Sequence, residues 1–292
     1  MLARAFVALQ YLLPQHLLSR GMLWLTRRRQ RWLRVPLTRL FLRGFRPDLS
    51  DALQPDAMAY PDFNSFFTRA LRADARPMPD TADAIASPVD GTVSQAGCIE
   101  AGLLLQAKGR QYSLEALLAG RERWIECFRD GQFATIYLAP YNYHRIHMPL
   151  TGTLTEAWHV PGRLFSVNAV TAAQVPELFA RNERLICGFD GARGPFAVVL
   201  VGALFVGSMS TVWHGNVTPR RRHAVTTLDP APDAAPLQRA RGEELGRFNM
   251  GSTVILLLPP RSGRWDTSLA PGRVLRVGQA IGHWPATGTA TS

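Results

Sequence analysis

The sequence of 292 residues contains a single lysine, Lys108, although lysine and arginine together number 33. Cysteine is also scarce: the three residues form no Cys-x-x-Cys pair and have no histidine partner at metal-ligand spacing. This pattern predicts neither a disulfide framework nor a metal site, and it is typical of a reducing compartment. A hydrophobic fraction of 47% with 19% charged residues predicts a globular chain with a sizeable core.

Acidic residues are absent from the first 46 positions, which hold ten arginines. This end therefore carries nearly all of the formal net charge of +11, and the remainder of the chain is close to neutral. Because the basicity belongs to one end of the chain, it gives no reason to expect a nucleic-acid partner.

Long apolar runs are missing as well. In residues 1–46, groups of Leu, Phe and Trp are interrupted by arginines, Pro14 and Pro36, whereas a membrane-spanning helix needs about 20 apolar residues. The segment also lacks the long apolar centre and small-residue cleavage site of a signal peptide. Short helices with apolar and arginine-rich faces predict peripheral association with an anionic cell membrane, on its cytoplasmic side. Packing on the protein's own core is the alternative, and both can hold at once.

Beyond residue 46 the sequence is dominated by short β-type runs separated by Gly and Pro turns. Strands are expected at 91–93, 103–106, 133–138, 196–201, 211–213 and 253–258, and helices at 63–69, 113–120 and 170–179. The pattern predicts an α+β fold, with a mainly antiparallel β-sheet core, N-terminal amphipathic helices and a few peripheral helices. We expect a membrane-associating segment (1–46) and a catalytic domain (47–292), with a surface excursion at 219–236 and a frayed tail at 285–292.

A Gly-Ser-Thr turn begins at Gly251, directly before the most apolar of the expected strands. Glycine is the ordinary residue for such a turn, so the motif alone can be explained by turn geometry without any chemical role. Glycine followed by a hydroxyl residue is also what a self-cleaving chain needs. The oxygen of Ser252 could attack the carbonyl of Gly251, which no side chain shields.

Two other stretches supply the groups that activate a hydroxyl. Asp90 lies in an Asp-Gly turn, and His144 and His147 form a His-x-x-His pair that has no third metal ligand nearby. Acid–base chemistry suits these histidines better. Asp90, His147 and Ser252 together provide the carboxylate, imidazole and hydroxyl that activate a serine.

Two alternatives remain at this point. A serine hydrolase acting on lipids would use the same three residues in an uncut chain, although Ser252 is not in a Gly-x-Ser-x-Gly elbow. A non-catalytic membrane-binding module would account for residues 1–46 but not for the histidines or the Gly-Ser-Thr turn.

The motifs, taken in order, resemble those of bacterial phosphatidylserine decarboxylases of the membrane-associated, pyruvoyl-dependent type. The resemblance covers nearly the whole chain and rests on the basic apolar start and on residues 63–67, 88–91, 106–109, 112–118, 143–149, 165–168, 179–184, 201–203, 246–248 and 251–253. The family usually has leucine where Met250 stands, a residue of similar volume. This difference puts the speed of maturation in question, but not the function.

The resemblance implies that the chain cleaves itself between Gly251 and Ser252, giving a β chain (1–251) and an α chain (252–292) that form a heterodimer. It implies that His147, oriented by Asp90, accepts the Ser252 proton, and that Ser252 becomes a covalent pyruvoyl group, the pyruvate cofactor. This group would form a Schiff base with phosphatidylserine and release phosphatidylethanolamine after decarboxylation.

The resemblance also gives His144 a role as a second active-site histidine, in substrate binding or in protonation after CO₂ leaves. The Schiff base would use the substrate's amine, so the mechanism agrees with a chain that holds one lysine. Assembly into a homo-oligomer is left open.

Overall fold

The computed structural model describes residues 2–205, 208–218, 224–228, 230 and 235–284. The expected tail at 285–292 lies outside the described residues, as does much of the expected surface excursion at 219–236.

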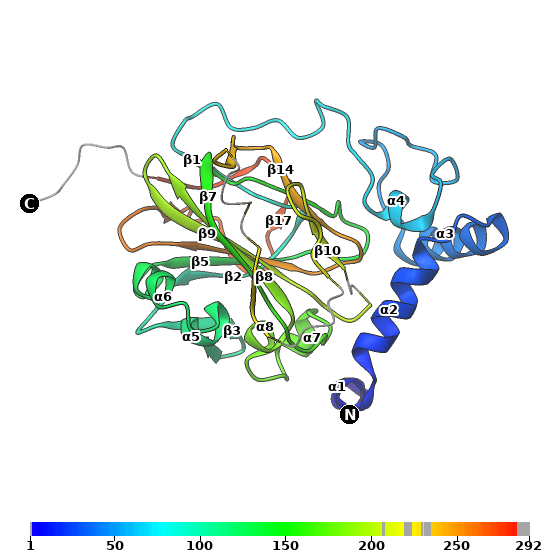
Figure 1. The fold of residues 1–292 in the computed structure, drawn as a ribbon, viewed down its shortest axis with the longest axis horizontal. Coiled ribbons are helices and arrows are strands. Elements are labelled where there is room, and N and C mark those ends of the chain that lie inside the picture. Colours follow the sequence, from blue (N-terminus) through cyan, green and yellow to red (C-terminus); the bar gives the residue numbers. More distant parts are fainter. Residues whose placement is uncertain (1, 206–207, 219–223, 229, 231–234, 285–292) are drawn as a thin grey trace, which may run out of the picture.

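Three helices form the N-terminal part of the molecule: α1 (Leu2–Leu12), α2 (Gln15–Thr26) and α3 (Arg31–Phe45). They lie along one flank of the β-sheet body (Figure 1). Pro14 stands between α1 and α2, since a proline disfavours helical conformation in the residue before it. Pro36, in contrast, lies inside α3. In the described residues no helix is both long and apolar enough to cross a membrane.

The N-terminal helices are tied to the body by apolar and polar contacts. Phe41 of α3 packs against three phenylalanines, Phe63, Phe66 and Phe67, of the short helix α4 (Phe63–Phe67). The Gln10 side chain accepts a hydrogen bond from the backbone N–H of Ser166 at 2.8 Å. Packing on the protein's own core, one of the two sequence-based expectations, is therefore found.

A nine-stranded antiparallel sheet forms the centre of the body. Its strand order is β12-β7-β8-β9-β15-β5-β2-β17, with β13 paired to β7. The strands are β2 (Gly91–Cys98), β5 (Gln132–Tyr137), β7 (Gly152–Val160), β8 (Arg184–Gly191), β9 (Gly194–Val201), β12 (Thr226–Thr227), β13 (Gln238–Arg239), β15 (Thr253–Leu258) and β17 (Val274–Leu275). Every residue of β15 is buried, because this strand runs between β9 and β5. The antiparallel α+β fold predicted from the sequence is confirmed.

Three smaller sheets and four short helices surround this centre. The sheets are β1 (Ala84–Ala86), β18 (Ala280–His283) and β16 (Arg264–Trp265); β11 (Gly215–Asn216), β10 (Met209–Thr211), β14 (Glu244–Phe248) and β6 (Arg145–His147); and β3 (Leu103–Ala107) with β4 (Arg110–Ser113). The helices are α5 (Leu114–Leu118), α6 (Glu122–Phe128), α7 (Ala169–Ala172) and α8 (Leu178–Arg181).

The expected helix at 170–179 is wrong as a single element, because α7 and α8 divide this stretch. Pro176 causes the break: the residue before a proline avoids the helical conformation, and Glu177 then adopts a positive φ of 52°. The expected helix at 113–120 is confirmed as α5. The Ser113 side chain caps its first turn, and Gly120 follows it in a left-handed conformation.

Candidate active site

The Gly251–Ser252 junction lies at the head of β15, where the chain enters the central sheet. The backbone carbonyl of Ser252 accepts a hydrogen bond from the N–H of Leu138 at 2.8 Å, which fixes the residue beside the end of β5. Ser252 is fully buried, and its Oγ has no hydrogen-bond partner among the described residues. A buried hydroxyl without a partner costs free energy, so such atoms gather at sites where they have another use.

His144 lies against this junction. A Cβ added to Gly251 would be 3.3 Å from His144 Nε2 and 3.2 Å from the Leu138 carbonyl oxygen, so the glycine permits a close approach. The His144 ring is fully buried and lies 4.1 Å, centroid to centroid, from the ring of Phe67 in α4.

The protonation state of His144 follows from its surroundings. Its Nδ1 is 2.8 Å from the carbonyl oxygen of Asn142, a group that can only accept, so Nδ1 carries the proton. Burial, with a smaller contribution from the Arg69 charge, lowers the pKa of His144 to about 3, against the opposing effect of the Asn142 hydrogen bond. The imidazole is therefore neutral at pH 7. Its Nε2 has a lone pair and no hydrogen-bond partner among the described residues.

His147 comes from β6 and is held at both ring nitrogens. Nδ1 lies 2.7 Å from the carbonyl oxygen of Gly242, to which it donates, and Nε2 lies 2.9 Å from the hydroxyl of Tyr143, from which it accepts. Burial lowers the pKa of His147, while the Gly242 hydrogen bond partly opposes this effect. The second histidine is thus also a neutral imidazole at pH 7.

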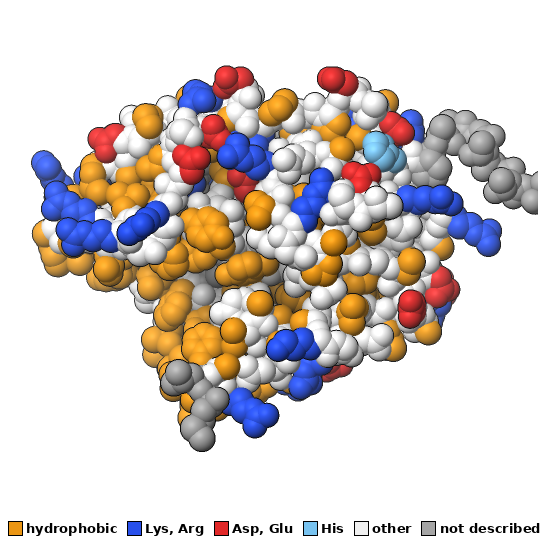
Figure 2. All heavy atoms as spheres, turned by 180° about the vertical axis from the view of Figure 1, so that it is seen from behind, with side chains coloured by type: hydrophobic (Ala, Val, Ile, Leu, Met, Phe, Trp, Pro, Cys, Tyr) orange, Lys and Arg blue, Asp and Glu red, His pale blue; other side chains and the backbone are white. Residues whose placement is uncertain are grey.

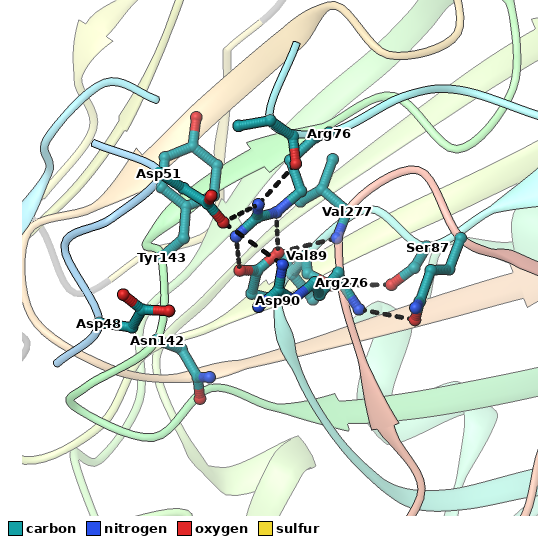
Figure 3. A network of polar contacts seen from close by, with 12 residues as sticks. Asp48, Asp51, Arg76, Ser87, Val89, Asp90, Asn142, Tyr143, Arg276 and Val277 are labelled. Carbon is teal, nitrogen blue, oxygen red and sulfur yellow. Dashed lines mark hydrogen bonds and ion pairs between the residues drawn. The ribbon is translucent and has the colours of Figure 1, made fainter. Parts of the chain in front are cut away.

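Asp90, in the turn before β2, makes its contacts with other groups (Figure 3). Arg76 donates a hydrogen bond to each carboxylate oxygen, from Nε to Oδ1 at 3.0 Å and from Nη2 to Oδ2 at 2.6 Å. The backbone N–H of Val277 donates to Oδ1 at 2.8 Å. Among the described residues no hydrogen bond joins Asp90 to His147, or His147 to Ser252. The catalytic roles of these residues stay predictions.

The structure therefore brings His144 to the Gly251–Ser252 junction. His147 instead contacts Tyr143 and Gly242, and Asp90 contacts Arg76 and Val277. Neither Tyr143 nor Arg76 was singled out from the sequence. Tyr143 could have been found from its place between the expected strand and the two histidines. Arg76 gave no signal, because it lies in a proline-punctuated stretch without a motif.

A cavity of about 350 Å³ adjoins the junction, between the N-terminal helices and the central sheet. Its lining is mostly apolar and comes from α2, α3, α4, the end of β5 and the segments that precede α7 and follow β9. Met22, Phe41, Phe45, Phe67, Met250 and Gly251 are among the lining residues. Within the described ranges no cluster of His, Cys, Asp and Glu could hold a metal ion.

These features define an enzyme-type site in an antiparallel α+β fold, in which a buried hydroxyl and the neutral imidazole of His144 lie near an apolar cavity. A family model described as phosphatidylserine decarboxylase matches residues 63–283, and a model described as PSD matches residues 5–46. The chain belongs to the phosphatidylserine decarboxylase family.

Curated relatives match over almost their full length. The phosphatidylserine decarboxylase proenzyme of Azotobacter vinelandii (strain DJ) is 52% identical over 280 residues, covering 96% of this chain and 98% of the relative. The proenzymes of Ectopseudomonas mendocina (strain ymp) and Pseudomonas putida (strain GB-1) are each 51% identical, with the same coverage.

Proposed function

We propose that this protein is a proenzyme that cleaves itself between Gly251 and Ser252 and then decarboxylates phosphatidylserine to phosphatidylethanolamine. The observation that carries the proposal is the buried, unpartnered Oγ of Ser252 at a glycine that His144 Nε2 approaches closely. The names of the curated relatives supply the reaction and the term proenzyme.

The cleavage needs only groups of this chain and one water. Ser252 Oγ attacks the Gly251 carbonyl carbon and gives its proton to a neutral imidazole. The Gly251–Ser252 C–N bond breaks, and the amine of Ser252 takes up a proton. The resulting ester loses the Cα proton of Ser252 and releases Gly251 as a carboxylate. Water then replaces the nitrogen, which leaves as ammonia. The product is a pyruvoyl group at the start of the α chain (252–292).

A pyruvoyl group at this position would hold the substrate amine and accept the electrons that loss of CO₂ leaves behind. His144 would lie close to it, with Nε2 free to hold or deliver a proton. His147 remains our choice for the base in cleavage, with Asp90 acting on it through its charge. To take the Ser252 proton, His147 Nε2 must exchange Tyr143 for Ser252.

The apolar cavity next to Gly251 suits the glycerol and acyl part of a phospholipid. Residues of α2 and α3 line part of this cavity, so we propose that the lipid enters from the side of the N-terminal helices. After cleavage the α chain would remain bound as half of a heterodimer, because β15 pairs with β9 on one side and β5 on the other.

The N-terminal helices support peripheral association with an anionic membrane. Figure 2 shows hydrophobic side chains gathered over the part of the surface formed by these helices, with basic side chains at its edge. Exposed apolar residues there are Phe6, Leu9, Leu12, Leu17, Trp24, Trp32 and Leu40. The guanidinium of Arg28 lies 3.9 Å from the ring centre of Trp24, so charge and apolar surface occur together. The cytoplasmic face of the cell membrane supplies the anionic lipids.

A serine hydrolase is less well supported. The Gly251 carbonyl adjoins Ser252 Oγ through the backbone, Ser252 is not in a Gly-x-Ser-x-Gly elbow, and the curated relatives are named proenzymes.

Intact-mass measurement of the purified protein tests the proposal. We expect a large chain ending at Gly251 and a small chain, beginning at position 252, with a blocked amino terminus. Ser252→Ala should stay whole and inactive. Thr253→Val is the matched control, since Thr253 is also buried with an unpartnered hydroxyl but does not follow the glycine. This variant should still cleave. Active wild-type protein with a single uncut chain would overturn the proposal.

A further inference from the structure

The contacts of Asp90 raise a question about its effect on His147. In a hydroxyl-activating triad the carboxylate accepts the Nδ1 proton of the histidine. Here the carbonyl of Gly242 occupies that position, and the carboxylate of Asp90 is engaged elsewhere. Asp90 still lies near His147, because the backbone N–H of His147 donates to the carbonyl of Pro88, two residues before Asp90, at 2.8 Å.

Arg76 is the residue that engages Asp90. Its guanidinium meets the carboxylate with two parallel hydrogen bonds, the strongest and most directional geometry for such a pair. Both side chains are largely buried, with 12% of Arg76 and 10% of Asp90 exposed, so water screens the pair little. The third guanidinium nitrogen, Nη1, contacts Asp51 Oδ2 at 2.8 Å, which fixes the arginine from the opposite side.

This arrangement determines which charges surround His147. Glu244 faces it from β14, Arg145 lies two residues before it on β6, and the Tyr143 hydroxyl bonds its Nε2. Glu244 is itself paired with Arg145 and Arg247. Without Arg76, the negative charge of Asp90 would act on His147 uncompensated by its direct partner, and a nearby negative charge favours the protonated imidazole.

We propose that Arg76 is a positioning residue for self-cleavage: it holds both oxygens of Asp90 and offsets the charge of this carboxylate, which keeps His147 unprotonated and able to act as a base at neutral pH. The proposal rests on the self-cleavage proposed above. It gives Asp90 a charge-tuning role in place of a hydrogen bond to the histidine.

The pH dependence of cleavage separates this role from a structural one. Proenzyme is made by cell-free synthesis, transferred to buffers between pH 5 and 9, and followed by the appearance of the α chain. In Arg76→Gln the acidic midpoint of the cleavage rate should rise by roughly 0.5 to 1 pH unit, with a plateau near the wild-type rate at high pH. Arg76→Lys keeps the positive charge and should keep the midpoint close to that of wild type.

Arg276→Gln is the matched control, because Arg276 contacts Asp51 at 3.3 Å and makes no hydrogen bond with Asp90. Its midpoint should not move. A slower Arg76→Gln with the wild-type midpoint at every pH would overturn the proposal and leave Arg76 with a structural role. Wild-type protein that never cleaves would instead refute the proposed function.

A second comparison remains decisive if Arg76→Gln does not fold. When Asp90 is already Asn, Arg76 has no carboxylate to hold at this position, so adding Arg76→Gln should change the cleavage rate less than twofold. A further loss of tenfold or more in this double variant, measured against Asp90→Asn, would show that Arg76 acts independently of Asp90 and would overturn the proposal.

Discussion

Gly251→Ala tests how closely the scissile peptide is fitted to its surroundings. Gly251 does not have a positive φ, so alanine can adopt its backbone conformation without strain. The new Cβ, however, would lie 3.2 Å from the Leu138 carbonyl oxygen and 3.3 Å from His144 Nε2. Both contacts are tighter than ordinary van der Waals contact, so the peptide or its neighbours must move by a few tenths of an ångström.

The expected cost follows from this displacement. A misplacement of about 1 Å at reacting atoms costs about 100-fold in rate, so a few tenths should slow cleavage roughly three- to tenfold. The assay is the time course of α-chain formation after cell-free synthesis, with the fold checked by thermal unfolding. Gly191→Ala is the control, since its Cβ would also lie 3.2 Å from backbone oxygens but away from the junction. Cleavage of Gly251→Ala at the wild-type rate would refute the argument that the glycine is needed for close approach.

Further predictions concern the histidines and the membrane surface. His147→Ala should slow cleavage by about 10²- to 10⁴-fold, because it removes the base. Asp90→Asn should slow it by less, because it removes only a charge that makes His147 a stronger base. Normal processing of the His147 variant would exclude that residue as the base. Burial lowers the pKa of His144 to about 3, whereas His144 in the unfolded chain takes up a proton below about pH 6.5. Uncleaved Ser252→Ala protein should therefore lose stability as the pH falls below about 6.5. A melting temperature that stays constant from pH 7 to pH 4 would contradict this. Trp32→Ser should weaken binding to anionic vesicles, whereas Val274→Ser, at a similarly exposed apolar side chain on the sheet, should not; equal effects would argue against the N-terminal helices as the contact surface. Removal of residues 1–46 should shift the protein toward the soluble fraction and reduce activity on vesicles more than activity on a short-chain analogue. High salt alone should release the intact protein only in part, because salt does not screen apolar burial. Complete release by salt would show that charge alone holds it there.

Much of the fold could be predicted because its signals are local. The apolar run at 253–258 is long enough to indicate a fully buried strand, and it is the central β15. Strands β7 and β8 were not predicted: the polar residues in GTLTEAWHV interrupt the apolar pattern of β7, and RLICGFDG lacks a clear alternation. Their place in the sheet depends on pairing with each other across a long connection, which local periodicity does not report.

The order of amino acids sets which residue types are available for chemistry. A Gly-Ser turn before an apolar strand, two histidines in one short motif, an Asp-Gly turn and a single lysine are properties of the chain before it folds. Which of these groups meet depends on how the strands and loops pack. This packing brought His144 to Gly251 and paired His147 with Tyr143 and Gly242. It also placed the carboxylate of Asp90 where it accepts hydrogen bonds from Arg76, fourteen residues away, and from the backbone N–H of Val277. The physical reason is that a hydrogen bond requires its partners within about 3 Å and in line, a condition that the packing of strands and loops meets and that residue type and spacing do not encode.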